Sequence, residues 1–320
     1  MSAPKVFVAG HRGLLGSALV RELRARGYPT PLTRSRKDLD LRNQVAVSRF
    51  FTEERPTAVF VAAAKVGGIQ ANSDKPWEFL LENLEIQNNL LGCALEHNVK
   101  RVVFFGSSCI YPKHADQPLR EEYLLTGPLE PTNEFYAIAK IAGLKLVEAA
   151  NSQYGMEWLS LMPTNLYGPG DNFDLTTSHV LPALIRKFHE AKTSARTGSI
   201  APVRLWGTGR ALREFLHVDD VAVAACDLME SGGTGLFNVG SGEEISIKDL
   251  AAMIARVVGY DGQVEWDSTK PDGTPRKLLD SSKIRATGWK PRISLASGIA
   301  STYEWYLAHA APPTRAEALA

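Results

Sequence analysis

The chain has 320 residues, which at about 150 residues per domain predicts roughly two domains. Charged residues make up 22% and hydrophobic residues 44%, a composition typical of globular proteins. Lys and Arg number 36 against 35 Asp and Glu, so the net charge is +1. This balance argues against a nucleic-acid binder or a polybasic membrane anchor, but it allows a local basic pocket for a phosphorylated small molecule.

The apolar segments are short. The longest uninterrupted run, Ala58–Ala64, has seven residues, whereas a membrane helix needs about 20. The run at Lys5–Ala9 lacks the long apolar core of a signal peptide. Cys93, Cys109 and Cys226 form no CxxC pair. We therefore expect no membrane partner, neither a disulfide framework nor a zinc site, and a cytoplasmic location.

The first half of the chain alternates short apolar runs with amphipathic stretches of helical length. Strands are predicted at Lys5–Ala9, Ala58–Ala63, Arg101–Gly106 and Glu157–Met162, with the end of a further strand at Pro31–Thr33. Helices are predicted at Leu14–Arg26, Trp77–His97 and Glu134–Ser152. Buried runs that alternate with helices predict the α/β class, with a Rossmann-type doubly wound parallel sheet covered on both faces.

The rhythm changes after Pro163, where shorter mixed elements follow. A helix at Leu216–Leu228 and a strand at Leu236–Val239 are expected to return to the first domain. We therefore assign residues 1–165 plus about 216–241 to the Rossmann domain. Residues 166–215 plus 242–309 are assigned to a smaller mixed α/β domain for substrate. The small and polar residues of 310–320 predict a disordered tail.

A glycine-rich turn joins the first predicted strand to the first helix. Gly10, Gly13 and Gly16 have the spacing GxxGxxG. Such a turn lets the backbone bend sharply and approach a pyrophosphate, while the helix N-terminus offers free N–H groups and a positive dipole end. The alternative is that the glycines serve only a tight turn. Their place in the first strand–turn–helix unit favours a dinucleotide site.

The residues after the expected second strand indicate which dinucleotide is bound. An NAD-binding fold usually places an acid there for the ribose 2′-hydroxyl, but residues 33–37 contain no acid and Asp38 is the first. Arg12 lies within the glycine turn, and Arg36 lies in the 33–37 run. Guanidinium groups suit a 2′-phosphate, so NADP(H) is favoured over NAD. Asp40–Leu41 would then border the adenine; the alternative is a solvated basic loop.

Three polar residues form a candidate catalytic group. Ser107 follows a buried strand, at the sheet edge where open α/β folds bind ligands. Tyr136 and Lys140 are spaced i, i+4 and so share one helix face. A phenol titrates near pH 10, and we expect the Lys140 ammonium to lower that pKa and to hold the cofactor ribose. Ser107 would hydrogen-bond the substrate oxygen. The alternative for the tyrosine and lysine is a surface pair.

Several motifs together resemble a known family. GHRGLLG at 10–16, SSCIYP at 107–112 and YAIAK at 136–140 resemble the extended short-chain dehydrogenase/reductase superfamily. Longer stretches resemble the GDP-L-fucose synthases within it: 62–72, 104–113, 162–174, 178–192, 206–220 and 276–283. The resemblance extends from about residue 5 to 308. It implies conversion of GDP-4-keto-6-deoxy-D-mannose to GDP-L-fucose by epimerisation at C3 and C5 and NADPH-dependent reduction at C4.

The resemblance also implies residue roles. Ser107, Tyr136 and Lys140 match the reductase triad, and Cys109 and His179 match the acid–base pair for epimerisation. A 4-keto group acidifies the protons at C3 and C5, and thiol and imidazole groups titrate on either side of neutral pH. Taken alone, Cys109 is as consistent with a small buried hydrophobe, and His179 with an ordinary residue at a helix start.

Further residues match positions that bind ligands in the family. Those matching NADP contacts are Gly10, Arg12, Gly13, Leu14, Leu15, Gly16, Arg36, Asp40, Leu41, Phe105, Gly106, Ser107, Ser108, Lys140, Pro163, Thr164, Asn165, Leu166 and His179. Those matching GDP-sugar contacts are Lys187, Trp206, Arg213 and Asp280. Structural roles for these residues remain open. Trp206 could lie in the hydrophobic core, Arg213 could pair with a neighbouring acid, and Asp280 could cap a helix. No residue pattern indicates a metal site.

Two alternatives to the leading function stay open. One is another nucleotide-sugar epimerase or reductase of the superfamily, including a 4-epimerase that retains NAD. The other is a non-catalytic NADP-sensing protein, which would need only the glycine turn. The resemblance also implies a homodimer packed through Trp77–His97 and Glu134–Ser152. The alternative is that the apolar faces of these helices are buried within one chain.

Overall fold

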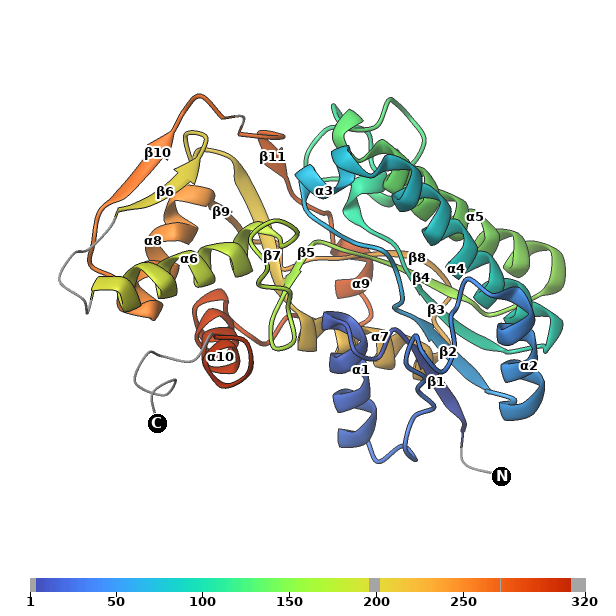
Figure 1. Ribbon diagram of the computed structural model, residues 1–320. Coiled ribbons are helices and arrows are strands. Elements are labelled where there is room, and N and C mark those ends of the chain that lie inside the picture. Colours follow the sequence, from blue (N-terminus) through green and yellow to red (C-terminus); the bar gives the residue numbers. More distant parts are fainter. Residues whose placement is uncertain (1–3, 196–201, 271, 312–320) are drawn as a thin grey trace.

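The computed structural model describes residues 4–195, 202–270 and 272–311, which form two lobes (Figure 1). One lobe is built on a five-stranded sheet with the order β1-β2-β3-β4-β8. All its neighbouring strands are parallel. The strands are β1 (Val6–Ala9), β2 (Ala58–Val61), β3 (Arg101–Phe105), β4 (Leu159–Pro163) and β8 (Gly235–Val239). The predicted doubly wound parallel sheet is confirmed.

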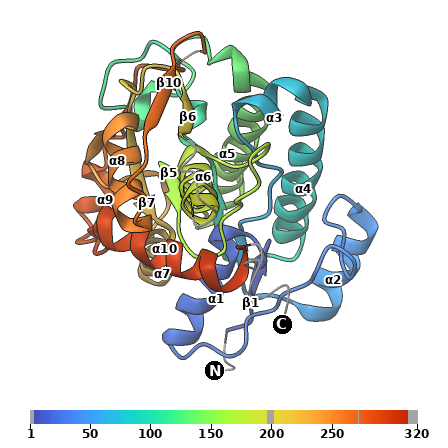
Figure 2. The same cartoon turned by 60° about the vertical axis from the view of Figure 1, so that its left-hand side comes forward.

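Helices cover both faces of this sheet, as parallel strands without a polar face require. On one face lie α1 (Leu14–Ala25) and α7 (Val218–Ser231), and their core includes Leu19, Phe60 and Val221. The other face is covered by α2 (Gln44–Glu54), α4 (Pro76–Glu96) and α5 (Glu134–Tyr154), around Leu90, Phe104 and Leu144. Helices α4 and α5 pack side by side along their length (Figure 2).

The second lobe is smaller and mixed. Its helices are α6 (Val180–Ala195), α8 (Ile247–Val258) and α10 (Leu295–His309), which share a core that includes Phe188, Ile254 and Tyr306. Its strands are β5 (Asn165–Tyr167), β6 (Val203–Trp206), β7 (Leu212–His217), β9 (Glu244–Ser246), β10 (Val264–Asp267) and β11 (Arg276–Lys277). Strand β7 is central, because β5, β9 and β11 all pair with it. The boundaries proposed between the two domains remain a prediction.

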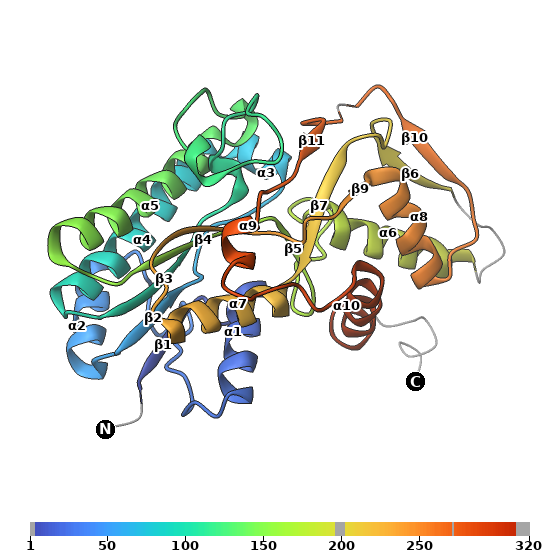
Figure 3. The same cartoon turned by 180° about the vertical axis from the view of Figure 1, so that it is seen from behind.

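Short elements complete the region between the lobes. Figure 3 shows β11 and α9 (Ser282–Arg285) lying between them. The remaining short elements are α3 (Ile69–Asp74), η1 (Ser108–Ile110), η2 (Glu121–Tyr123) and η3 (Pro131–Asn133). In the described part of the chain, no helix has the length and apolarity needed to cross a membrane.

Two predicted elements were wrong in detail. The helix expected from Leu216 begins only at Val218, because Phe215, Leu216 and His217 pair with β5. The His217 side chain then accepts a hydrogen bond from the Asp219 N–H and caps α7. The first two residues of the predicted helix are therefore strand.

The strand end predicted at Pro31–Thr33 is reduced to a single bridge. Leu32 pairs with Phe7 through two backbone hydrogen bonds, and no longer strand forms there. Because this segment and β2 flank β1 on opposite sides, the chain reverses its winding direction at β1. Open α/β sheets bind ligands at the carboxyl ends of strands at such a reversal. The predicted tail lies outside the described residues from 312 onward.

A buried carboxylate ties the two lobes together. Glu214 on β7 is fully buried, and its two carboxylate oxygens accept hydrogen bonds from Gly242 N (2.7 Å) and Leu279 N (3.1 Å). Its backbone oxygen accepts from Thr164 Oγ1 (3.2 Å) and Asn165 Nδ2 (2.8 Å). Burial raises the pKa of Glu214, and the two backbone N–H groups oppose that rise. One residue thus joins the segments that follow β4, β8 and β11.

Replacing this residue should destabilise the fold. Glu214→Ala leaves two buried N–H groups without acceptors, and we expect a loss of about 3 kcal/mol in the free energy of unfolding. Urea unfolding monitored by circular dichroism measures this loss. Glu265→Ala removes an exposed ion pair with Arg204, and this control should change stability by less than about 0.5 kcal/mol. Equal stability of the two variants would contradict the role given to Glu214.

Candidate active site

The glycine turn lies at the carboxyl end of β1. Gly10 has φ +86°. A Cβ on Gly10 would lie 2.7 Å from Ala63 N, and one on Gly16 would lie 2.1 Å from Gly10 O, so neither position has room for a side chain. Gly13 caps α1 without a side chain, and the first turn carries no acid. The N–H groups of Leu14 and Leu15 therefore begin the helix without intrahelical partners, which fits the pyrophosphate of a dinucleotide.

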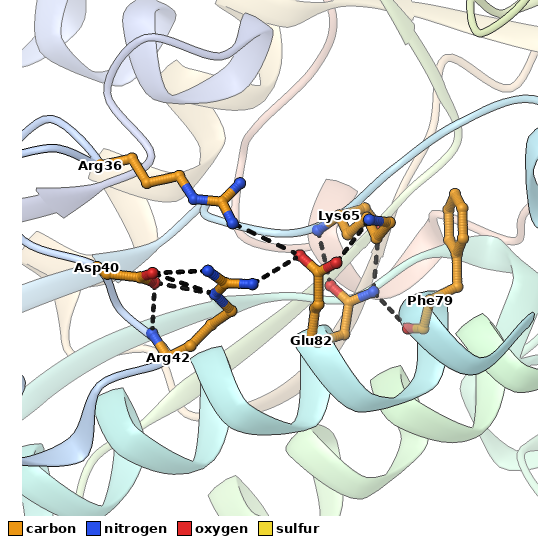
Figure 4. A network of polar contacts seen from close by, with 7 residues as sticks. Arg36, Asp40, Arg42, Lys65, Phe79 and Glu82 are labelled. Carbon is orange, nitrogen blue, oxygen red and sulfur yellow. Dashed lines mark hydrogen bonds and ion pairs between the residues drawn. The ribbon is translucent and has the colours of Figure 1, made fainter. Parts of the chain in front are cut away.

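The basic residues beyond the turn form an ion-pair network (Figure 4). Glu82 on α4 lies 2.7 Å from Lys65 Nζ, 3.7 Å from Arg42 Nη1 and 4.0 Å from Arg36 Nη2. Arg42 also binds Asp40 at 2.7 Å and lowers the pKa of Asp40 to about 2. Glu85 also acts electrostatically on Arg42, so the acids balance the three cations. Arg36 has the longest of these contacts and a largely exposed side chain, so its guanidinium can bind a phosphate. Arg42 and Lys65 are members of the network that the sequence analysis missed.

Ser107, Tyr136 and Lys140 meet where β3 ends. Ser107 follows β3 and hydrogen-bonds Tyr136. Lys140 is buried, donates to Phe105 O at 2.8 Å and lies 5.9 Å from the centre of the Tyr136 ring. The ring of Phe79 packs edge-on against Tyr136. The structure thus brings the predicted triad together.

The electrostatics of this group differ from the expectation. Burial raises the pKa of Tyr136, a nearby Cys109 charge adds to the rise, and the hydrogen bond with Ser107 opposes it. The predicted lowering of this pKa by Lys140 is therefore not found. Burial lowers the pKa of Lys140 to about 8. At neutral pH the phenol keeps its proton, which is the form required of a general acid.

Cys109 has two polar neighbours that the sequence analysis missed. Its sulfur accepts a hydrogen bond from Asn133 Nδ2 at 3.1 Å and one from Lys277 Nζ at 3.4 Å. Asn133 directly precedes α5, whereas Lys277 lies on β11 of the second lobe. Two N–H donors stabilise negative charge on the sulfur. Cys109 is also partly exposed, which does not fit the alternative of a small buried hydrophobe.

His179 precedes α6 at the end of an ordered loop. Asp174 shapes that loop by accepting hydrogen bonds from Thr176 N and Thr177 N, both at 3.0 Å. The imidazole is accessible to solvent, but protein atoms surround it closely. This desolvation, together with the positive charge of Lys277, lowers the pKa of His179. Lys277 therefore acts on both Cys109 and His179, which places the two candidate acid–base residues in one neighbourhood.

Two candidate substrate residues are cations without an ion-pair partner among the described residues. Burial lowers the pKa values of Lys187 on α6 and Arg213 on β7. Arg213 donates to its own neighbour, Leu212 O, at 2.8 Å. Neither residue has an ion pair within the described chain, so the alternative in which Arg213 pairs with a neighbouring acid is not seen. Desolvated cations of this kind are typical of an anion site.

The other two substrate candidates lie nearer the surface. Trp206 is 61% exposed, with Lys270 Nζ 5.7 Å from its ring centre, so it is not a core residue. Asp280 accepts a hydrogen bond from Ser282 N at 2.9 Å. This contact fits the alternative in which Asp280 caps α9. Contact of either residue with a GDP-sugar remains a prediction.

The remaining cofactor candidates lie at the carboxyl ends of β3 and β4. Phe105, Gly106 and Ser108 surround Ser107, and Pro163–Leu166 spans the end of β4 and the start of β5. A Cβ on Gly106 would lie 2.3 Å from the Met162 side chain. Arg12 is exposed at the glycine turn. Their contacts with a cofactor stay predictions. In the described ranges, no group of three or more His, Cys, Asp or Glu residues could hold a metal ion.

Comparison with known proteins identifies the class. Residues 6–240 match the NAD dependent epimerase/dehydratase family. Over 304 residues the chain is 54% identical to GDP-L-fucose synthase 1 of Arabidopsis thaliana, covering 95% of this chain and 93% of that protein. The chain therefore belongs to the NAD dependent epimerase/dehydratase family and, within it, to the GDP-L-fucose synthases.

Solved structures agree with this assignment. A GDP-6-OMe-4-keto-L-xylo-heptose reductase from C. jejuni is 39% identical with a TM-score of 0.88, covering 96% of this chain and 99% of that one. A GDP-L-fucose synthetase from Naegleria fowleri bound to NADP is 28% identical with a TM-score of 0.86, covering 95% of this chain and 94% of that one.

The buried ammonium of Lys140 makes stability depend on pH. Because the folded state lowers its pKa from 10.5 to about 8, the unfolded chain binds more protons between these values. The stability of wild type relative to Lys140→Met should therefore rise by about 3 kcal/mol from pH 8 to 10.5. Denaturant unfolding across this range measures the rise. Lys145→Met removes an exposed ammonium from the same helix and serves as the control. A flat difference for Lys140→Met would contradict the buried-ammonium assignment.

Proposed function

We propose that this chain converts GDP-4-keto-6-deoxy-D-mannose to GDP-L-fucose. It epimerises C3 and C5 and then reduces the C4 ketone with NADPH. The observation that carries this proposal is a second proton-transfer set, Cys109 and His179 with Lys277 beside both. This set lies next to the Ser107–Tyr136–Lys140 group. A simple reductase needs only the latter group.

Reduction uses the protonated tyrosine. NADPH, when bound, supplies the hydride to C4. Tyr136 Oη donates the proton that the C4 oxygen gains, and Ser107 hydrogen-bonds the same oxygen. Lys140 supplies a cation beneath the tyrosine ring and, with its ammonium protonated, suits the cofactor ribose. The glycine turn and the largely exposed guanidinium of Arg36 support NADP(H) as the cofactor, as does the NADP-bound relative.

Epimerisation uses the thiol and the imidazole. The C4 ketone acidifies the hydrogens on C3 and C5, because the electron pair left by each proton delocalises onto the ketone oxygen. One of the two groups removes the proton, and the other returns a proton to the opposite face. We assign these roles jointly to Cys109 and His179, without fixing which group acts as the base. The unpaired cations Lys187 and Arg213 would bind the diphosphate of the substrate.

Other members of the family do related chemistry, so a second function is considered. The C. jejuni relative, at 39% identity, is a reductase of a GDP-4-keto sugar. A reductase of this kind would consume NADPH without inverting C3 or C5. A 4-epimerase would recycle its cofactor, and a sensor would consume none. The two donors on the Cys109 sulfur favour the epimerase–reductase.

The test separates proton transfer from reduction. In D₂O with GDP-4-keto-6-deoxy-D-mannose and NADPH, Cys109→Ser should stop deuterium entry at C3 or C5, since a hydroxyl cannot serve as the acid or base near neutral pH. His179→Gln should do the same, because an amide cannot cycle a proton. Tyr136→Phe should lower NADPH oxidation by about 10²–10⁴-fold. Product stereochemistry and deuterium content by NMR, with absorbance at 340 nm, measure these effects.

For each variant, one result would contradict the role assigned to the replaced residue. Near-normal NADPH oxidation by Tyr136→Phe would exclude Tyr136 as the proton donor. Unchanged deuterium entry at both carbons in Cys109→Ser and His179→Gln would remove both from the mechanism. Reduction without epimerisation in these variants would yield a GDP-6-deoxy sugar of D configuration, which identifies the lost step directly.

We propose a homodimer as the assembly. Helices α4 and α5 expose apolar side chains at helical spacing, with Trp77 71%, Phe135 44% and Ile138 41% exposed. Leu81 on α4 and Leu146 on α5 are also exposed. Two copies packing these faces together would bury a continuous apolar area. We also propose a cytoplasmic location, because Cys93, Cys109 and Cys226 are free thiols.

One substitution tests the dimer. Ile138→Glu places a charge among the exposed apolar residues of α5, and we expect light scattering to report a monomer where wild type is a dimer. Leu307→Glu introduces the same charge at an exposed position of α10 (47% exposed) and is the matched control. A wild-type monomer, or a dimer that survives Ile138→Glu, would contradict the assignment.

A further inference from the structure

The side chain of Asn133 does not cap the helix that it precedes. Asparagine before a helix normally accepts a hydrogen bond from the first turn, as Asn43 does from Ala46 N at 3.0 Å. Asn133 directly precedes α5, yet its side chain makes no such bond, and its backbone has φ −138° and ψ 20°. The 3-10 turn η3 leads into α5 instead, with Glu130 accepting from Thr132 N. The helix start therefore does not require this asparagine.

The Asn133 amide is directed at the active-site sulfur. Nδ2 donates to Cys109 Sγ at 3.1 Å, while Oδ1 is buried and has no hydrogen-bond partner in the described structure. Lys277 donates to the same sulfur, and an ammonium has no acceptor atom. The sulfur thus accepts hydrogen bonds from two donors. The amide nitrogen of Asn133 is hydrogen-bonded, whereas its amide oxygen is not.

A buried acceptor without a partner is costly and uncommon in folded proteins. The Asn133 amide bears this cost while its Nδ2 donates to the sulfur and its side chain leaves α5 uncapped. The orientation of the side chain therefore serves the contact with Cys109.

We propose that Asn133 is a positioning residue whose Nδ2 holds the Cys109 sulfur in place for proton transfer. The proposal deepens the proposed function and rests on its epimerisation step. In the direction in which Cys109 acts as the base, its S–H bond forms and the C–H bond of the substrate breaks. The electron pair of that bond moves onto the C4 ketone oxygen. Asn133 takes no proton in this step; it fixes the position of the sulfur.

The first test uses the free protein and needs no substrate. Asn133→Asp keeps the size of the side chain and is an equally good helix cap, but its carboxylate cannot donate to sulfur. We expect alkylation of Cys109 by iodoacetamide at pH 7.5 to slow about 10-fold or more, as for the loss of a hydrogen bond to a charged group. Peptide mass spectrometry separates Cys109 from the buried Cys93 and Cys226. Asn133→Ala, which also lacks the donor, should slow it in the same direction.

The second test follows turnover. With GDP-4-keto-6-deoxy-D-mannose and NADPH in D₂O, Asn133→Asp should slow deuterium entry by about 10–100-fold. NADPH oxidation should fall much less than deuterium entry, so the product mixture should shift to the unepimerised D sugar. Asn43→Asp is the matched control, because the Asn43 side chain serves as a cap and lies outside the site. It should alkylate and turn over as wild type does.

The outcomes are separable. Wild-type alkylation and deuterium entry in Asn133→Asp would overturn the proposal. So would an equal loss of deuterium entry and NADPH oxidation accompanied by a lowered unfolding temperature, because that pattern is structural. If wild type itself gives no deuterium entry, the proposed function fails, and the alkylation rates still decide whether Asn133 holds the sulfur.

Discussion

The arrangement of the site depends on one buried carboxylate, Glu214. Its two side-chain oxygens bind the backbone after β8 and after β11, and its backbone oxygen binds the segment after β4. Charged groups are buried in proteins only where hydrogen bonds compensate the lost hydration. This compensation fixes the path of residues 276–280, which carry Lys277 from the second lobe to the Cys109 sulfur. Further bonds between Leu119 and the backbone of Leu278 and Asp280 hold the same path.

The consequence is a site with two chemistries. The edge of the parallel sheet supplies the glycine turn, Ser107 and the segment after β4, which suit a dinucleotide and a reduction. The second lobe supplies His179 and Lys277, and we propose that these residues serve proton transfer together with Cys109. Burial keeps Tyr136 protonated and lowers the pKa values of Lys140 and His179. The same desolvation thus prepares an acid on one side of the site and a neutral imidazole on the other.

Sequence patterns predicted the elements whose formation depends on neighbouring residues in the chain. The strands at Val6–Ala9 and Arg101–Phe105 were recognisable because a strand buried on both faces is a continuous apolar run. The start of α7 was misplaced because the pairing of β7 with β5 outweighs an apolar periodicity that continues across the junction. Asn133 and Lys277 escaped sequence analysis for a different reason. Lys277 is brought to Cys109 by tertiary contacts alone, and Asn133 looks like an ordinary helix cap until its side chain is seen to point elsewhere.

The central claim is that one site moves protons at two carbons before it reduces a third. The most direct measurement is the isotope pattern of the wild-type product formed in D₂O from GDP-4-keto-6-deoxy-D-mannose and unlabelled NADPH. The account predicts GDP-L-fucose with deuterium at C3 and C5 and protium from the cofactor at C4. A product of D configuration with protium at all three carbons would contradict it.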